Sequence, residues 1–254
     1  MFTYPITFQT TFANGPGGIS NGLELWLDVA DASTVTASSS FISQIDDKSE
    51  YERHATEVAQ TRQPILVESE INGKNVAAFD GIADALPLQG TTMDFFHTTG
   101  EFDVILVFRP DITGFRYLIG NTNTTLETGM YLGITSGNIL NMAITKSVSG
   151  QTIVNHNSSF TLTLGEWALV EIRGDGTTSY MSNDMSTFAS KAFTSTLGSG
   201  SANRTFSIGS TRIGTSGGIG FTDCAIAEVI MYNRDLSTSE RADVKTYITN
   251  KYGL

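Results

Sequence analysis

The sequence predicts an all-β protein in which two β-sheets pack face to face as a jelly-roll sandwich. Its 25 glycines and its many Thr and Ser residues suit short strands joined by frequent turns. Short apolar runs separated by turn residues recur along the chain, at the spacing typical of a sandwich. A chain of 254 residues, 40% of them hydrophobic, is long enough for one large core.

Each strand candidate is a short apolar run bounded by residues that favour turns. No fixed-period repeat occurs, which argues against propellers and solenoids. The clearest candidates are residues 23–29, 76–79, 103–108, 116–120, 129–134, 139–144, 167–174, 179–182, 206–210 and 224–233.

Residues 1–22 form a separate N-terminal segment, an edge strand followed by a Gly-rich hinge. Apolar and polar residues alternate along residues 2–9, and Pro5 cannot donate to a neighbouring strand, which predicts an edge position. Such a strand either folds back onto its own domain or adds to a neighbour's sheet as an assembly arm, and both interpretations stay open. The candidate contact residues of the assembly arm are Phe2, Tyr4, Ile6, Phe8 and Phe12.

Residues 236–254 predict the one long helix of the chain. Ser237 and Glu240 form a capping-box pattern, and Gly253 stands where a left-handed helix end is expected. An apolar stripe at helical spacing predicts that this helix docks on the sandwich. The stripe consists of Val244, Tyr247, Ile248 and Tyr252.

Five segments of the sequence carry a family resemblance. They are "LELWLDVADASTV" (23–35), "ISQIDDKSEYERHATEVAQTRQP" (42–64), "INGKNVAAFDGIADAL" (71–86), "EFDVILVFRPD" (101–111) and "IAEVIMYNRDLSTSERADVKTYITNKYGL" (226–254). In this order they resemble the concanavalin A-like lectin and glucanase group in its laminin-G-like form. The resemblance implies a laminin-G-like jelly roll over residues 23–235. Its concave face would serve carbohydrate or protein binding, in a group that extends from secreted bacterial enzymes to phage structural proteins.

The charge balance excludes several classes of partner. A net charge of −11 leaves no basic stripe for phosphates, so we expect neither nucleic-acid binding nor attraction to an anionic membrane. We also expect no membrane insertion, because no segment reaches the length of a membrane span. The N-terminal residues lack the pattern of a secretory signal, which predicts a protein made in a cytoplasm or exported without such a signal.

Glu101 and Asp103 raise the question of a glucan-hydrolase site. Laminarinase-type hydrolases of this group carry a third acid on the same strand, whereas here the third position is Ile105 or Leu106. We therefore predict that the two acids only begin a solvated strand, that the chain has no catalytic residue and that it is not an enzyme.

Metal sites have little support in the sequence. His54, His97 and His156 are far apart and lack partners at the spacing of a zinc site. The single Cys224 predicts a buried apolar position. Calcium is the only cofactor with any support, through acids near predicted loops, although acids in turns usually serve the turn itself. The acids are Asp46, Asp47, Asp80 and Asp84.

Aromatic residues are the candidate sugar contacts. Trp26 and Trp167 lie in apolar strands and are predicted to fill the core. Tyr117, Tyr131 and Tyr180 are freer candidates for a glycan platform.

Three functions remain as hypotheses. The first is a virion protein, such as a phage head-decoration, fibre or tail component, that assembles with copies of itself and with other virion proteins and displays a lectin-like domain toward host glycans. The alternative is a free carbohydrate-binding module or lectin. A glucan hydrolase is the third and weakest, since the third carboxylate is absent.

Overall fold

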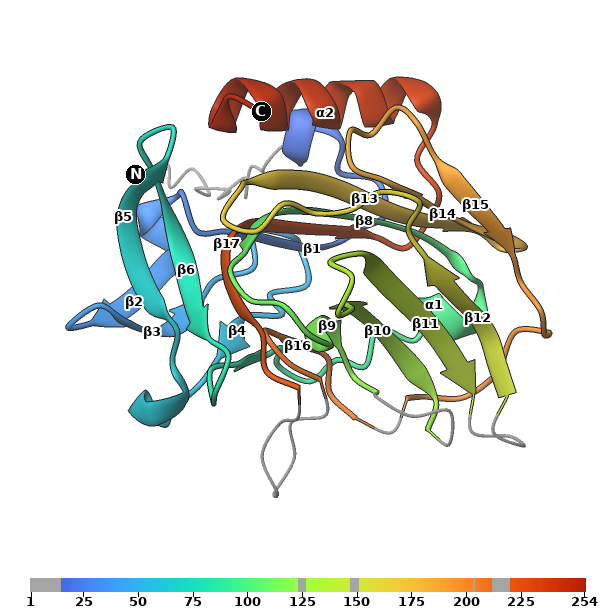
Figure 1. Cartoon of the computed structure of the whole chain (residues 1–254), viewed down its shortest axis with the longest axis horizontal. Helices are drawn as coiled ribbons and strands as arrows, with labels where there is room; N and C mark the ends of the chain where they lie inside the picture. The colour runs from blue at the N-terminus through green and yellow to red at the C-terminus, as the bar shows by residue number, and fades with distance from the viewer. Residues whose placement is uncertain (1–14, 123–126, 147–150, 203, 212–219) are drawn as a thin grey trace, which may run out of the picture.

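The computed structural model describes residues 15–122, 127–146, 151–202, 204–211 and 220–254 (Figure 1). Within these ranges the chain forms two antiparallel β-sheets and one long C-terminal helix, so the predicted jelly-roll sandwich is confirmed. The five candidate residues of the assembly arm, Phe2, Tyr4, Ile6, Phe8 and Phe12, lie outside the described residues.

The larger sheet has eleven strands within the described ranges, in the order β15-β14-β13-β8-β17-β6-β5-β3-β2, with β1 paired to β17 and β4 paired to β3. Its strands are β1 (Leu23–Asp28), β2 (Val35–Ser38), β3 (Phe41–Ile45), β4 (Ala55–Thr56), β5 (Ile65–Ile71), β6 (Lys74–Asp80), β8 (Glu101–Pro110), β13 (Ala168–Asp175), β14 (Thr178–Ser182), β15 (Ala189–Ala192) and β17 (Asp223–Tyr232).

The smaller sheet has six strands within the described ranges, in the order β12-β11-β10-β9-β16-β7. Its strands are β7 (Leu86–Pro87), β9 (Arg116–Gly120), β10 (Gly129–Ile134), β11 (Leu140–Lys146), β12 (Gln151–Asn157) and β16 (Ser207–Ile208). The helical elements are η1 (Pro16–Gly18), η2 (Ala32–Thr34), η3 (Gln60–Arg62), α1 (Phe95–Thr98) and α2 (Thr238–Tyr252). No described helix is long and apolar enough to cross a bilayer.

The main core lies between the two sheets, and alternation along each strand decides which side chains enter it. On β8 the inward residues are Phe102, Val104, Leu106 and Phe108. Strands β9, β10 and β11 supply the opposing wall, with Leu118, Leu132 and Met142 among its buried residues. Cys224 is buried in this core, as predicted, and burial raises the pKa of its thiol.

A second apolar cluster lies on the outer face of the larger sheet, under α2. Figure 1 shows α2 lying along β13, β8, β17 and β1. The capping box between Ser237 and Glu240 begins the helix, and Gly253 ends it at a φ of 75°, both as predicted. Val244, Ile248 and Tyr252 are buried against this face, so the predicted docking is confirmed.

A buried carboxylate fastens the helix to the sheet. Glu228 on β17 accepts hydrogen bonds from Trp26 Nε1 at 2.6 Å, Tyr247 Oη at 2.8 Å and Tyr252 Oη at 2.7 Å. Lys251 Nζ on α2 lies 2.8 Å from Glu228 and 2.5 Å from Asp28 on β1. Burial, and secondarily the charge of Asp28, raises the pKa of Glu228. The helix therefore supplies the donors and the cation that a buried acid requires.

The sequence-based strand candidates all appear in the structure, but several strands were missed. The missed strands are β2, β3, β4, β5, β7, β12 and β15, which are short, largely polar or at a sheet edge. Pairing with neighbours rather than local apolar pattern defines such strands.

Lys251→Met is expected to lower the free energy of unfolding by about 3 kcal/mol, because it leaves the buried Glu228 without its cation, whereas Asp28 keeps Lys48. Urea denaturation followed by tryptophan fluorescence measures the change. Lys245→Met is the matched control on the same helix, since among the described residues Lys245 Nζ donates only to the exposed hydroxyl of Ser186, and the effect should stay within about 0.5 kcal/mol. Equal stabilities of the two variants would contradict the anchoring role of Lys251.

Candidate functional site

The two sheets differ in what covers their outer faces. Helix α2 lies over the outer face of the larger sheet, whereas no described helix covers β9 to β12 of the smaller sheet (Figure 1). The outer face of the smaller sheet is therefore the sheet surface open to a ligand. Its residues come from alternate positions of β9, β10, β11 and β12.

Three aromatic rings gather at one end of this face. Phe115 and Tyr117 have ring centroids 4.9 Å apart, Tyr117 and Tyr131 are 5.1 Å apart, and Phe115 and Tyr131 are 6.1 Å apart, all edge to face. Phe115 is 39% exposed, and both tyrosines are partly buried. Burial raises the pKa of Tyr117 to about 12 and also raises that of Tyr131, so both hydroxyls remain neutral donors at ordinary pH.

Three asparagines stand at the other end of the same face. Asn141 Nδ2 on β11 donates to Asn155 Oδ1 and to Asn157 Oδ1 on β12, both at 2.7 Å. These bonds use the acceptor oxygens of Asn155 and Asn157, so their Nδ2 amines are directed elsewhere. Among the described residues these two amines have no protein partner, which leaves their N–H donors available at an exposed edge.

The strand register places the tyrosines and the asparagines in two adjacent rows across the sheet. Tyr117, Gly133, Asn141 and Asn157 lie opposite one another across the four strands. A Cβ at Gly133 would lie 2.5 Å from the backbone oxygen of Arg116, so this central position must remain glycine. Tyr131, Ala143 and Asn155 form the next row. Three strand spacings separate β9 from β12, about 14 Å in all.

We call this surface the platform, and it combines a predicted pair with residues that the sequence did not single out. Tyr117 and Tyr131 were predicted as glycan contacts, and the structure brings them together. Tyr180 lies on β14 of the other sheet, under the Arg173 guanidinium at 3.8 Å, and is not part of this surface. The platform consists of Phe115, Tyr117, Tyr131, Asn141, Asn155 and Asn157.

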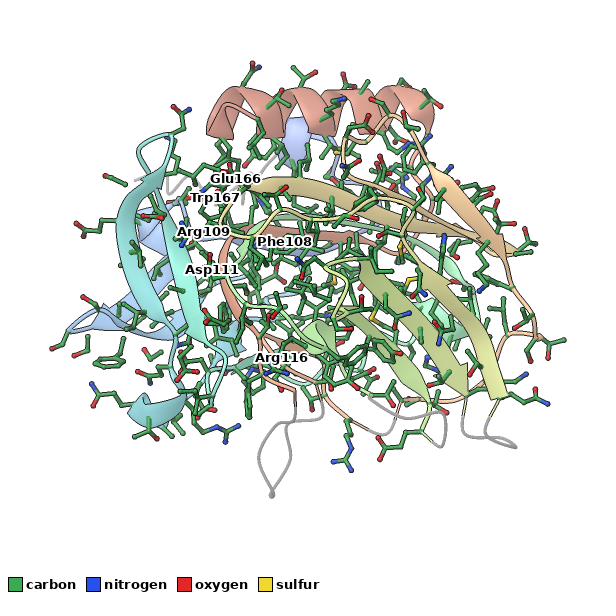
Figure 2. All side chains as sticks on the ribbon, in the orientation of Figure 1. Phe108, Arg109, Asp111, Arg116, Glu166 and Trp167 are labelled. Carbon is green, nitrogen blue, oxygen red and sulfur yellow. The ribbon has the colours of Figure 1, made fainter. Side chains whose placement is uncertain are left out.

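The two tryptophans take different positions. Trp26 is buried beneath α2, as predicted. Trp167 is only partly buried, which corrects the prediction that it fills the core. Its ring packs on the outer cluster and faces the Arg109 guanidinium, 5.5 Å from the ring centroid (Figure 2).

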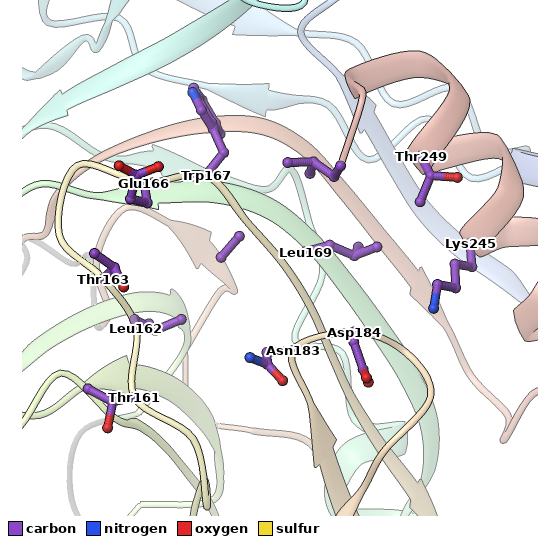
Figure 3. Close-up of a pocket in the computed structure, with 12 residues that line it drawn as sticks. Thr161, Leu162, Thr163, Glu166, Trp167, Leu169, Asn183, Asp184, Lys245 and Thr249 are labelled. Atoms are coloured by element: carbon purple, nitrogen blue, oxygen red, sulfur yellow. The ribbon is translucent and has the colours of Figure 1, made fainter.

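A cavity of about 430 Å³ lies beside α2, between the helix, β13 and the turn after β14 (Figure 3). Its apolar lining consists of Leu162, Trp167, Ala168, Leu169 and Leu254, and some of the polar groups around it already bond other residues. Asp184 Oδ1 accepts from the backbone N–H groups of the following turn at 2.8 Å, and Lys245 Nζ donates to a serine hydroxyl of the same turn at 2.7 Å.

Glu101 and Asp103, the two acids considered as a hydrolase site, lie in different environments. Glu101 is exposed, as predicted, but Asp103 is 0% exposed, so the prediction of a solvated strand start is wrong for Asp103. Asp103 faces the outer cluster beside Glu171 of β13, which is also 0% exposed. The only described cation within 4.0 Å of Glu171 is Arg241, whose Nε lies 3.6 Å away.

The sequence did not reveal this buried pair, because the two residues are distant in the chain. Their four carboxyl oxygens find no hydrogen-bond donor among the described residues. Burial, and secondarily the negative charge of Glu171, raises the pKa of Asp103 well above its ordinary value. Burial raises the pKa of Glu171 to about 7. A single acid inside an otherwise apolar strand, as in "WALVEI", was the available signal.

The candidate calcium ligands lie in two separate loops and serve local backbone geometry. Asp47 accepts from the backbone N–H of Trp26 at 2.8 Å and of Ser49 at 2.9 Å. Asp80 Oδ1 accepts from the backbone N–H groups of residues 82, 83 and 84. Asp84 accepts from the Asp80 N–H, and Asp46 accepts from the Gln44 amide.

The histidines are equally dispersed. His54 follows β3, His97 is in α1, and His156 on β12 is buried, with its pKa lowered to about 4 by that burial. In the part of the chain that the structure describes, no group of three or more His, Cys, Asp or Glu side chains is placed to hold a metal ion.

Solved structures share this fold over most of the chain. The binding domain of Paraclostridial Mosquitocidal Protein 1 matches with a TM-score of 0.63 at 14% identity, over 90% of this chain and 53% of that one. A Trypanosoma rangeli sialidase in complex with sialic acid matches with a TM-score of 0.57 at 15% identity, over 91% of this chain and 33% of that one. The same sialidase with the inhibitor DANA gives a TM-score of 0.58 at 14% identity.

These matches show the fold alone, a jelly-roll sandwich of two sheets. The chain spans about a third of the sialidase chains and about half of the toxin's binding domain. No protein-family model matches the chain, and no curated protein matches its sequence.

The matches also correct one prediction. We predicted that the chain is not an enzyme because the third acid of the glucanase strand is missing. Sialidases, which are enzymes, stand among the structures of the same fold and contradict that prediction. The three-acid glucanase motif belongs to one kind of glycoside hydrolysis. Its absence therefore does not decide whether a chain of this fold is an enzyme.

Asp103→Asn is expected to remove the part of the pH dependence of stability that Asp103 contributes. A carboxyl whose pKa is higher in the folded chain binds its proton more tightly there, so its contribution is complete below the unfolded pKa and is lost as the pH rises through the folded one. For Asp103 this window opens near the ordinary pKa of 3.8 and extends well above it, because burial and the charge of Glu171 raise the folded pKa. As the pH rises through this window, the free energy of unfolding of the variant should therefore increase relative to that of the wild type by about 1 kcal/mol or more. Urea denaturation at each pH measures the difference.

The exposed Glu101→Gln on the same strand is the control, and its stability should follow the wild type at every pH. If the free energies of unfolding of the wild type and of Asp103→Asn change in parallel with pH, Asp103 does not titrate in this range.

Proposed function

We propose that this chain is a lectin-like module that binds glycans on the platform of its smaller sheet. One observation carries the proposal: an aromatic trio and an amide ladder lie in register on the one sheet face that no described helix covers. Aromatic faces and uncommitted amide donors are the two kinds of group that a sugar surface requires.

The chemistry of a sugar ring explains the pairing. A pyranose has an apolar face of C–H groups, which packs against an aromatic ring, and a rim of hydroxyls, which accept from amide N–H groups. Phe115 supplies the most exposed ring, while Asn155 and Asn157 supply donors about 14 Å away across the sheet. This separation suits an oligosaccharide of about three units rather than a single sugar.

The fold supports the proposal at the level of architecture. A sialidase in complex with sialic acid and the binding domain of a mosquitocidal protein share the sandwich.

Tyr117→Ala and Tyr131→Ala are each expected to weaken glycan binding about tenfold, because each removes a ring from the packed trio. A glycan array identifies a ligand for the wild type, and isothermal titration calorimetry then measures the affinity of each variant. Tyr180→Ala is the matched control, since it removes the same side chain from the other sheet and should leave affinity unchanged.

Two results would contradict the platform as the binding surface. One is unchanged affinity of both platform variants when their thermal unfolding shows that they are folded. The other is a loss in Tyr180→Ala as large as the loss in Tyr117→Ala.

A virion role is a second, finer proposal that rests on the sequence alone. An edge strand at residues 1–12 would add to a neighbouring copy and present many platforms on a phage particle made in a host cytoplasm. Many copies would convert weak glycan affinity into strong attachment.

The solution masses of the full chain and of a chain starting at Gly15 test the arm. Light scattering should show an oligomer for the full chain and a folded monomer for the shortened one, because only the former carries the edge strand. Two monomers would remove the arm from the assembly proposal, while leaving glycan binding on the platform intact.

A further inference from the structure

Lys251 holds two buried carboxyl groups at its amine, and this arrangement differs from the other lysine ion pairs of the chain. Its Nζ lies 2.5 Å from Asp28 Oδ1 on β1 and 2.8 Å from Glu228 Oε2 on β17. The side chains of Asp28 and Glu228 are 5% and 0% exposed, and that of Lys251 is 14% exposed. Lys48 also contacts two acids, but its second partner, Asp31, is 35% exposed. Among the described lysines, Lys251 alone has two buried carboxyls within 4.0 Å.

These three groups have the roles that amide formation needs. An amide forms when an amine nitrogen attacks a carboxyl carbon while a neighbouring acid–base group moves the protons. Lys251 carries the amine, Asp28 carries the carboxyl that is attacked, and Glu228 is the proton carrier. The contact between Nζ and Oδ1 holds the nitrogen beside the reacting carboxyl before any bond forms.

Glu228 is suited to carry a proton rather than to be attacked. Its carboxyl is fixed in place by hydrogen bonds from Trp26 Nε1, Tyr247 Oη and Tyr252 Oη. Burial, and secondarily the charge of Asp28, raises the pKa of Glu228. The buried acid therefore takes up a proton more readily than an exposed glutamate does, and it contacts the amine from which that proton comes.

Lys48 prepares the Asp28 carboxyl for attack. Among the described residues this carboxyl accepts only from Lys251, at Oδ1, and from Lys48 Nζ, which lies 3.0 Å from Oδ2. Burial by itself lowers the pKa of Lys48, but the hydrogen bond to Asp31 and the charge of Asp28 raise it overall, so Lys48 keeps its proton. Its positive charge stabilises the negative charge that develops on Oδ2 during the attack.

We propose that Lys251 and Asp28 condense to an intramolecular amide once the chain has folded, which joins α2 covalently to β1. The Nζ–Cγ bond forms and the Cγ–Oδ1 bond breaks. Of the three protons on the Lys251 ammonium, one stays on the amide nitrogen and two leave with Oδ1 as water. These two pass through Glu228, which ends the reaction as it began. No electrons are transferred, and no co-reactant is needed.

The surroundings favour the condensed form. An ion pair taken out of water carries a large desolvation cost, whereas an amide is neutral. The N–H that remains on the nitrogen of Lys251 can still donate to Glu228, so this acid keeps a partner on α2. A surface depression lined in part by Asp28, Lys48 and Lys251 gives the released water a path to solvent.

Mass spectrometry of the denatured full chain tests the bond. The wild type should be lighter by one water than its sequence requires. Trypsin should release residues 1–48 joined to residues 246–254, because Lys48 and Lys245 are cleavage sites whereas a Lys251 in amide linkage is not. Fragmentation of this joined peptide should place the link between Asp28 and Lys251.

Four variants separate the roles. Lys251→Arg keeps the charge but cannot form this amide, so it should have its full mass and release no joined peptide. Lys245→Arg is the matched control on the same helix and should remain joined. Asp28→Asn should give the same product with loss of ammonia instead of water. Glu228→Gln should slow the joining about a hundredfold, followed as the joined fraction over time after expression. Thermal unfolding of each variant confirms that it is folded.

Three results would overturn the proposal. The first is the full mass in the folded wild type. The second is a joined peptide in folded Lys251→Arg, and the third is a link that fragmentation places at Lys48 or at Glu228. A folded Glu228→Gln chain that joins as fast as the wild type would overturn the role of Glu228 as proton carrier. All of these results are independent of glycan binding, because the platform lies on the other sheet.

Discussion

The burial of Glu228 beneath helix α2 is the interaction on which the rest of the structure depends. An ionisable group in the middle of β17 cannot remain buried without partners, and the helix supplies them through Tyr247, Lys251 and Tyr252, with Trp26 donating from β1. The helix is thereby held over the larger sheet and closes its outer face. That closure leaves the smaller sheet as the open surface of the sandwich.

The outer faces of the two sheets differ in the charge of their side chains. The covered face carries charged groups paired or enclosed under the helix, including the acid pair Asp103 and Glu171, whose pKa values are raised by burial. The open face carries neutral aromatic and amide groups. Removing charge from the open face lowers its desolvation cost on binding, so a sugar can displace water there without separating an ion pair.

The sequence by itself determined the sandwich, its principal strands and the C-terminal helix, because period-2 and period-3.6 patterns and the capping box of Ser237 and Glu240 are local signals. It also marked Tyr117 and Tyr131 as free aromatics. Only the tertiary structure decided that these two rings meet Phe115, that Asn141 bridges Asn155 and Asn157 in the same rows, and that Asp103 is buried against Glu171. The reason is physical: strand register and helix docking join residues distant in sequence, and no local pattern encodes which strands become neighbours.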